Sequence, residues 1–334
     1  MKKFVKRLSL LILSLTVVLN IFNVSCDAVT KKKKNLFFTY SNLSCLCATA
    51  IALCKPNEVN DVVITPPSYK DSTIIERLHK VFNRVYVKND FGFLNSCEGF
   101  STNYDCVFSA CAATADNVIF RANVNNGALG VIYDEDTSSY VRLFPLTCEN
   151  FSKRSFLLFP KYRVGPIKNF PSEQIPREKF LEAIKLLYEP KPIKTDVIFS
   201  LAESRAPTFN AKLNSNIFNI LKSFDGLTVS VKCHPFEQKK FLLPKQATEI
   251  NRLQPFEKFY YGFNGILISN LSSTVLTAKF MQPKSTVICT AYLDGAEIDK
   301  KWTPHIKMLK ELGVLFPKTL AELKSMISQN INKI

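Results

Sequence analysis

Short apolar segments with strand character alternate along the chain with helical segments, and this alternation constrains the fold more than any other feature. Residues 35–40 form the first such strand, and residues 41–42 are helix-capping types that precede an apolar helical stretch at residues 43–53. Alternation of this kind predicts a parallel sheet with helices on its faces. The same half of the chain contains predicted strands at residues 61–65, 84–87, 105–109, 130–133 and 138–141, and a predicted amphipathic helix at residues 71–82.

A proline-rich segment separates this series from a second one. Residues 158–194 contain six prolines, and residues 177–188 are their one clear helix, so we place a domain boundary there. The second series has predicted strands at residues 196–201, 227–232, 265–269 and 286–290, and predicted helices at residues 211–224, from 272 onwards, at 306–312 and at 320–327. The two series predict an α/β fold of two Rossmann-like domains, residues 35–190 and 191–334, after an N-terminal segment of residues 1–34. Ligands are expected between the domains, at the carboxyl ends of strands.

The N-terminal segment differs in composition from the rest of the 334 residues. Four basic residues precede the uncharged residues 8–24, and four lysines follow at residues 31–34, which predicts either a cleaved signal or a retained membrane anchor; we favour the anchor. This segment carries +7 of the net charge of +16, which leaves +9 for the remaining 300 residues. Such a surplus favours anionic partners such as acidic glycans, nucleotides or phospholipid surfaces. No familiar nucleic-acid-binding motif occurs, so no nucleic-acid partner is expected.

The ten cysteines do not form a metal-binding pattern. No C-x-x-C pair occurs, and no histidine lies near a cysteine at zinc-ligand spacing, so no metal site is expected. Cys45, Cys47 and Cys54 are predicted to be small core residues of a helix. In an oxidising compartment the candidates for disulfides, with no pairing implied, are Cys97, Cys106, Cys111 and Cys148.

Three adjacent carboxylates follow the predicted strand at residues 130–133. Asp134, Glu135 and Asp136 repel one another, and a partly desolvated member of such a cluster has a raised pKa that suits a general base. Taken alone, the pattern is explained better by a solvated acidic turn before the next strand.

A Lys-Cys-His-Pro motif follows the predicted strand at residues 227–232. Its His234 stands at a strand end, and Pro235 fixes the backbone beside the imidazole. A histidine in this place can protonate a leaving phosphate oxygen or hold its charge. The chain has two other histidines, His79 and His305. An ordinary surface histidine is the competing explanation.

A cluster of hydroxyl residues lies between another predicted strand and a helix. The strand ends at Ser269 and the helix begins near Ser272, which Ser273 and Thr274 follow. Hydroxyls and backbone N–H groups therefore converge at a positive helix terminus, which is typical of a phosphate site. Helix capping accounts for one of these hydroxyls but gives no reason for three in a row.

These motifs, in this order, resemble those of a known group of enzymes. An acidic pair followed by Ser139-Tyr140, then Lys-x-His-Pro, then a Ser-Ser pair that opens a helix, is similar to the motif set of the bacterial-type sialyltransferases and polysialyltransferases, which are glycosyltransferase families 52 and 38 and their relatives. Residues 37–43 are also similar to the first strand and loop of that group. The resemblance extends over residues 35–320, but only in short motifs.

The resemblance implies a GT-B fold and an inverting transfer of sialic acid from CMP-sialic acid to a hydroxyl of a glycolipid, glycoprotein or polysaccharide. It implies no metal and no other cofactor. Glu135 matches the base that deprotonates the acceptor, and His234 matches the group that protonates or stabilises the departing phosphate. The resemblance also implies donor-binding residues. Ser272 and Ser273 match the phosphate-binding pair, and Lys232 and Pro235 belong to the same motif as His234. Where the family has Gly after the acidic pair, this chain has Asp136, so the base remains open among Asp134, Glu135 and Asp136.

Two alternatives explain part of the pattern. A CDP-glycerol or CDP-ribitol phosphotransferase of GT-B fold also has His-Pro and Ser-Ser elements, but such enzymes usually carry an Asp shortly before the serines, where this chain has Asn270 and Leu271. A non-catalytic basic glycan-binding protein would explain the charge, but it gives no reason for the histidine and the serine pair to occur together.

The cellular compartment is predicted from three features. The anchor, the number of cysteines and the sequons that begin at Asn42, Asn150 and Asn270 favour a membrane-anchored protein in the lumen of the secretory pathway or Golgi. A protein of the bacterial inner membrane, or an exported one, is the alternative.

Overall fold

The computed structural model describes residues 31–65, 72–88, 101–110, 118–134, 137, 139–141, 151–202, 210–235, 237, 243, 247–295 and 298–331. The expected anchor, residues 8–24, lies outside these residues and stays a prediction. Within the described part, no helix combines the length and the apolar character needed to span a membrane. Lys34–Ile334 form one compact unit.

The first half of this unit is a parallel sheet of seven strands in the order β3-β2-β1-β4-β5-β6-β7. The strand β1 is buried along nearly its whole length, because apolar side chains such as Leu36, Phe37 and Phe38 cover both of its faces. Its strands are β1 (Lys34–Thr39), β2 (Val59–Ile64), β3 (Arg84–Val87), β4 (Cys106–Ala110), β5 (Leu129–Tyr133), β6 (Ser152–Leu157) and β7 (Ser172–Gln174).

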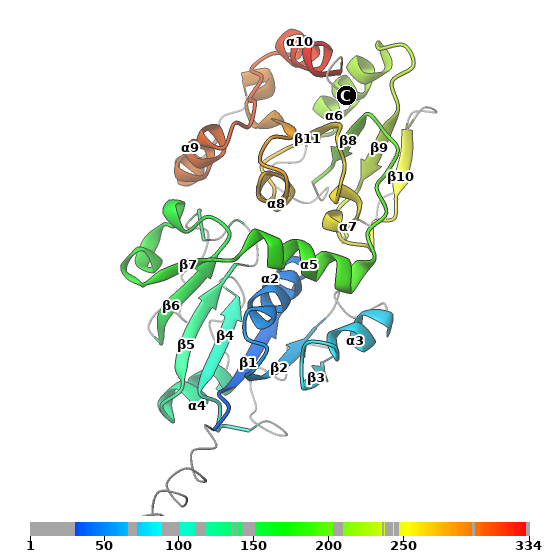
Figure 1. Ribbon diagram of the computed structural model, residues 1–334. Helices are drawn as coiled ribbons and strands as arrows, with labels where there is room; N and C mark the ends of the chain where they lie inside the picture. The colour runs from blue at the N-terminus through cyan, green and yellow to red at the C-terminus, as the bar shows by residue number, and fades with distance from the viewer. Residues whose placement is uncertain are drawn as a thin grey trace, which may run out of the picture. The chain divides into compact units, whose positions relative to one another are not determined.

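The α-helices described in this half are α2 (Asn42–Leu53), α3 (Ser72–Leu78), α4 (Val118–Asn125) and α5 (Arg177–Tyr188). The helix α2 begins directly after β1, where the Ser41 and Ser44 side chains cap each other's backbone N–H groups. Apart from its ends, α2 is buried on all sides, since it packs on the sheet and against α5 (Figure 1). A helix without a polar face requires two such covering layers.

The second half is a parallel sheet of five strands in the order β10-β9-β8-β11-β12 (Figure 1). Its strands are β8 (Val197–Ser200), β9 (Val229–Lys232), β10 (Ala247–Ile250), β11 (Ile266–Ser269) and β12 (Thr286–Cys289). Its helices are α6 (Ala211–Lys222), α7 (Phe256–Tyr260), α8 (Ser273–Met281), α9 (Thr303–Glu311) and α10 (Leu320–Ile331). The expectation of two strand-helix series with parallel sheets is confirmed.

The structure corrects the expectations for three segments of the first half. Residues 139–141 form a turn rather than a strand, because the backbone N–H groups of Tyr140 and Val141 both bond to the Thr137 carbonyl. The proline-rich segment does not simply link two domains, since it contains β7, a three-residue edge strand. Prolines are tolerated beside such an edge strand. The helix α3 ends at Leu78, four residues before the expected end.

The cysteines of α2 are not all core residues. Cys45 and Cys47 are buried as expected, whereas Cys54 is exposed because the helix ends at Leu53 and Cys54 is its C-terminal cap. Three of the disulfide candidates, Cys97, Cys111 and Cys148, lie outside the described residues, so that expectation stays a prediction.

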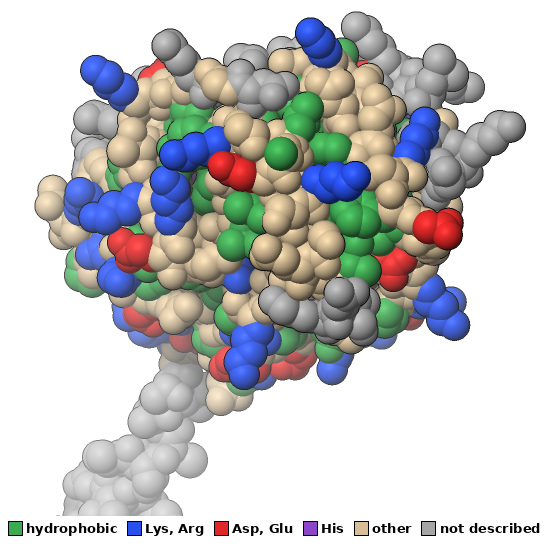
Figure 2. Space-filling view, turned by 90° about the horizontal axis from the view of Figure 1, so that it is seen from above, with side chains coloured by type: hydrophobic (Ala, Val, Ile, Leu, Met, Phe, Trp, Pro, Cys, Tyr) green, Lys and Arg blue, Asp and Glu red, His purple; other side chains and the backbone are tan. Residues whose placement is uncertain are grey.

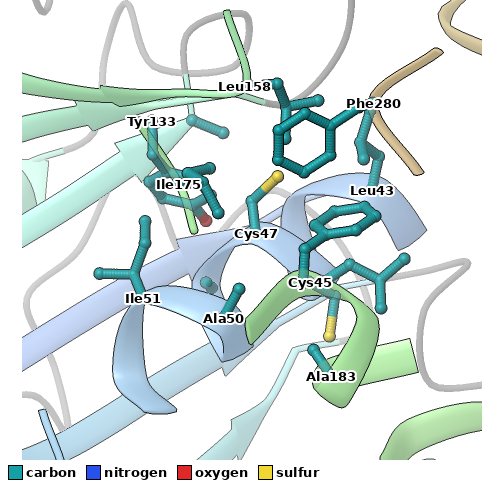
Figure 3. Packing of buried hydrophobic residues seen from close by; sticks show 14 of the residues in the cluster. Leu43, Cys45, Cys47, Ala50, Ile51, Tyr133, Leu158, Ile175, Ala183 and Phe280 are labelled. Carbon is teal, nitrogen blue, oxygen red and sulfur yellow. The ribbon is translucent and has the colours of Figure 1, made fainter. Parts of the chain in front are cut away.

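The helices α5 and α8 carry the contact between the two sheets. Phe280 of α8 packs edge-on against Phe159 and Phe180, with ring centroids 5.6 Å and 5.3 Å away. The Arg177 Nε donates to the Met281 carbonyl at 2.9 Å, at the end of α8. Figure 3 shows Phe280 in one cluster with Leu158 and with side chains of α2. A single hydrophobic cluster therefore includes residues of both sheets.

We expect Phe280→Ala to lower the free energy of unfolding by about 3–5 kcal/mol, because it empties an aromatic site that is 3% exposed. Phe218→Ala in α6 is the matched control, since Phe218 packs on Phe199 within the second sheet's own cluster and is only partly buried. Urea denaturation followed by circular dichroism measures both losses. A smaller loss for Phe280→Ala than for the control would contradict the role of this contact.

Candidate functional site

The carboxyl ends of the second sheet's strands place two of the predicted motifs close together. Lys232, Ser200 and Ser269 occupy one row across β9, β8 and β11. His234 and Ser272 follow this row by two and three residues. Since only β8 separates their strands, the strand axes are two spacings apart, roughly 10 Å. The sequence-predicted histidine and serines thus share one edge of the sheet.

His234 lies in a turn that follows β9 and is partly exposed. Its carbonyl accepts a hydrogen bond from the Glu237 backbone N–H at 3.0 Å, which closes the turn. Pro235 is part of the same turn. The imidazole is therefore presented at the strand end by local backbone structure rather than by a helix.

Lys232 has a buried side chain that joins two loops. Its Nζ donates to the carbonyl oxygens of Cys233 at 3.1 Å and of Arg252 at 3.0 Å. Burial lowers the pKa of Lys232 to about 8, although the nearby Glu257 carboxylate opposes this shift. The ammonium thus contacts backbone carbonyls at the base of the His234 turn, and its predicted role in donor binding stays a prediction.

The start of α8 carries the predicted serine pair. Ser272 is the N-cap, and its Oγ accepts from the Thr274 backbone N–H at 3.1 Å. The Thr274 hydroxyl lies 2.8 Å from that of Ser272 and 3.2 Å from that of Ser269. Among the described residues, none bonds to the Ser273 hydroxyl, whose residue is the first of the helix. Capping therefore explains Ser272, but it leaves Ser273 available to an anion at the positive end of α8.

Asp134 holds the turn of the first sheet that follows β5. Its carboxyl group accepts hydrogen bonds from the hydroxyls of Ser139 and Tyr140, each at 2.5 Å, and from the Leu158 backbone N–H at 2.6 Å. The side chain is fully buried. Burial and the negative charge of Asp134 raise the pKa of Tyr140 well above its usual value, so Tyr140 remains a hydrogen-bond donor. Three residues of the acidic Ser-Tyr motif, Asp134, Ser139 and Tyr140, are thus explained by the hydrogen bonds that hold this turn.

The other two acids of that motif, Glu135 and Asp136, lie outside the described residues. The assignment of the base to one of them therefore stays a prediction. Across the described part of the chain, no group of three or more His, Cys, Asp or Glu side chains is placed to hold a metal ion.

His305 is a buried residue whose surroundings the sequence did not reveal. It lies in α9 with its ring 6.4 Å from that of Tyr140 and 5.8 Å from that of Trp302. Neither ring nitrogen has a hydrogen-bond partner among the residues that the structure describes. Burial lowers the pKa of His305 to about 4, so the imidazole is neutral near pH 7. The remaining histidine, His79, is exposed just after α3.

A cavity of about 400 Å³ opens at the carboxyl ends of strands from both sheets. Asn42 and Thr73 line it from the starts of α2 and α3, after β1 and β2. Residues 251, 253, 254 and 255 line it from the loop after β10, and α5 contributes its last turn. Sequence analysis did not predict this cavity, because its lining comes from four distant segments that carry no shared motif.

The surplus of basic residues does not form one patch on the face seen in Figure 2. Lys and Arg side chains are scattered over that face, and Asp and Glu side chains lie among them. Local features such as the cavity are therefore better guides to an anionic ligand than the net charge.

The fold, but not a sequence family, relates this chain to known proteins. No protein-family model and no curated protein sequence matches it. The solved glycotransferase of kitacinnamycin is similar in structure, with a TM-score of 0.54 and 8% identity over 90% of this chain and 91% of that chain. A UDP-glucosyltransferase from Polygonum tinctorium capable of glucosylating indoxyl has a TM-score of 0.53 and 10% identity over 91% and 90% of the two chains. A ugt transferase from Siraitia grosvenorii has a TM-score of 0.51 and 10% identity over 90% and 91%. The chain therefore has a GT-B α/β fold.

We expect His305 to make the protein less stable in acid. Its pKa is about 4 in the folded chain and about 6.5 when unfolded, so the unfolded state binds the proton first as the pH falls. The stability that depends on a neutral His305 is therefore fully present above pH 6.5. It is lost as the pH falls from 6.5 to 4, which lowers the free energy of unfolding by about 3 kcal/mol. Denaturation at pH 7 and at pH 4.5 measures it.

His305→Phe removes this titration and keeps an aromatic ring beside Tyr140 and Trp302. It should lose clearly less stability on acidification than the wild type, whereas His79→Phe, at an exposed position, should lose as much as the wild type. Equal acid sensitivity of His305→Phe and the wild type would contradict the assignment.

Proposed function

We propose that the chain is an inverting glycosyltransferase that transfers sialic acid from CMP-sialic acid to a glycan hydroxyl. The GT-B fold supports glycosyl transfer, and the motif set supports the donor. The observation that carries the proposal is the position of His234 and the Ser272-Ser273 pair at one carboxyl edge of the second sheet, with only β8 between their strands. GT-B ligands bind at such edges.

On the leaving-group side, the phosphate of CMP departs with the electron pair of its bond to the anomeric carbon. The start of α8 and the Ser273 hydroxyl would bind that phosphate, because hydroxyl donors and the positive helix end both favour an anion. His234 would donate a proton to the departing oxygen or hold its charge as an imidazolium. The two groups act on the same phosphate, which explains why they share one edge.

On the acceptor side, a base must remove the proton of the attacking hydroxyl. Asp134 is ill suited to this role, because its carboxyl group is fully buried and accepts three hydrogen bonds. We therefore assign Asp134 to holding the turn and keep Glu135 as the base, with Asp136 as its competitor. The hydroxyl oxygen then attacks the anomeric carbon from the face opposite CMP, which inverts the configuration.

We expect His234→Ala to lower kcat for transfer from CMP-sialic acid by roughly 10²–10⁴-fold, which is the usual contribution of a general acid. The measurement is CMP release and product formation with the full chain and a set of galactoside acceptors. His79→Ala is the matched control, because His79 is exposed just after α3, and it should leave the rate unchanged.

Turnover undiminished in His234→Ala would remove His234 from the mechanism. Tight binding of CMP by the wild-type chain without transfer to any glycan would instead support a non-catalytic binding protein.

Alanine variants of the two serines should separate the effect of helix capping on stability from the effect of phosphate binding on CMP affinity. Ser272→Ala removes the N-cap of α8 and should lower the free energy of unfolding by about 1 kcal/mol. Ser273→Ala removes a hydroxyl that no described residue uses, so it should leave stability nearly unchanged and weaken CMP binding about threefold to tenfold. Thermal denaturation and calorimetric titration with CMP give the two readouts. Unchanged CMP affinity in Ser273→Ala would exclude it from the phosphate site.

A further inference from the structure

The cavity between the starts of α2 and α3 and the loop after β10 is distinct from the donor edge around His234 and Ser272. Two other cavities of comparable or larger size lie elsewhere. One is lined by Thr228, Val229 and Ala247, at the amino ends of β9 and β10, and the other by Ser285 and Thr286, at the amino end of β12. Ligands of open parallel sheets bind at carboxyl ends, so among these three cavities of the described structure the one at Asn42 and Asn251 is placed for a substrate.

The lining of this cavity is cationic. Arg77, Lys191 and Lys258 line it with positive charges, and Glu189 is the one acidic residue among the described lining residues. Neither lysine forms an ion pair with any residue that the structure describes. A cavity lined by two lysines that have no ion-pair partner within the described structure favours an anionic ligand.

Arg77 is held in position by a backbone carbonyl and by an ion pair. Its Nη1 donates to the Leu187 carbonyl at 2.8 Å, and its Nη2 lies 2.8 Å from the Glu189 carboxylate. The Glu189 side chain is 72% exposed, so water weakens this pair. These bonds fix the guanidinium on the wall of the cavity. The net positive charge of the described lining comes from Lys191 and Lys258.

Glu189 has a strained backbone at the same place. It ends α5 with a φ of 45°, and it is the one non-glycine residue with positive φ in the described structure. Backbone strain of this kind costs free energy and clusters at ligand sites. Here it turns the chain so that the last residues of α5 and Lys191 both line the cavity.

The uncharged part of the lining suits a sugar. Asn42, Asn251 and Gln254 supply carboxamides, which both donate to and accept from hydroxyl groups. Leu253, which is 52% exposed, offers an apolar surface to the C–H face of a ring. A volume of about 400 Å³ lies within the range of small-molecule sites.

We propose that this cavity binds an acidic sugar of the acceptor glycan, with Arg77, Lys191 and Lys258 contacting its negatively charged group. The proposal rests on the proposed function, since it assigns the acceptor of the same transfer. The amides then bind the hydroxyls of the acidic sugar, and the charge fixes its orientation relative to the donor edge.

The test is a calorimetric titration of the full chain with three probes: 3′-sialyllactose, which carries a carboxylate, galactose 6-phosphate, which carries a phosphate, and neutral lactose. We expect an acidic probe to bind at least about tenfold more tightly than lactose. Tighter binding of 3′-sialyllactose assigns the charge to a carboxylate, and tighter binding of galactose 6-phosphate assigns it to a phosphate. Lactose binding as tightly as both acidic probes, or no binding of any probe, would overturn the proposal.

The double variant Lys191→Gln/Lys258→Gln tests the residues themselves. It should weaken binding of the preferred acidic probe about tenfold and change lactose binding little. Lys168→Gln/Lys212→Gln is the matched control, because it removes the same charge at two exposed positions that do not line the cavity. An equal loss in both double variants would show general electrostatic attraction and would overturn the proposal.

Donor hydrolysis separates this proposal from the proposed function. Hydrolysis of CMP-sialic acid by the wild-type chain without any acceptor tests the transfer chemistry alone. Its absence would remove the proposed function, whereas the binding titrations decide the acidic-sugar site by themselves.

Discussion

The packing of α8 against the first half of the chain is the interaction on which the rest of the structure depends. Phe280 lies near the end of this helix and packs on Phe159 and Phe180, and Arg177 bonds to the Met281 carbonyl. The same helix begins at the Ser272 cap, at the carboxyl edge of the second sheet. One nine-residue helix therefore both joins the two sheets and forms one wall of the donor edge. Its C-terminal end is fixed in the common core, so the position of its N-terminal end at Ser272 follows from packing.

The acidic Ser-Tyr motif illustrates how one pattern can serve two purposes. Taken alone, the three adjacent carboxylates in the sequence favour a solvated turn over a base. In the structure Asp134 is neither, because its carboxyl group is buried and accepts hydrogen bonds from Ser139, Tyr140 and Leu158. The Tyr140 hydroxyl also accepts from the Phe159 backbone N–H at 3.0 Å. The motif is thus first a clamp that ties the end of β5 to the end of β6, and the proposed base is one of its other two acids, Glu135 or Asp136.

Periodicity predicted the fold where burial dominates the sequence. The apolar runs of β1, β2, β5, β8, β9 and β11 are buried strands, and helix α5 has the predicted bounds of residues 177 and 188. The strands β6 and β7 escaped prediction because their composition is mostly polar. The strand β6 reads Ser-Lys-Arg-Ser-Phe-Leu and β7 is only Ser-Glu-Gln, so hydrogen bonding to a neighbouring strand, rather than hydrophobicity, defines them.

Some parts of the candidate site could likewise be predicted from sequence, and others could not. His234 and Ser272 could be placed from sequence because strand ends and helix caps are local signals. The cavity could not, since Asn42, Arg77, Glu189 and Gln254 meet only in the folded chain. The same holds for His305, whose neighbour Tyr140 is remote in sequence.

A buried ammonium connects the donor edge to the cavity. Lys232 bonds both to Cys233, the residue before His234, and to Arg252, which lies between Asn251 and Leu253 of the cavity lining. Arg252 in turn donates through Nη1 to the Glu237 carbonyl at 2.8 Å, so the two loops are bonded to each other twice. His234, the proposed proton donor, and the proposed acceptor site are therefore tied to each other by a lysine that contacts backbone carbonyls of both loops.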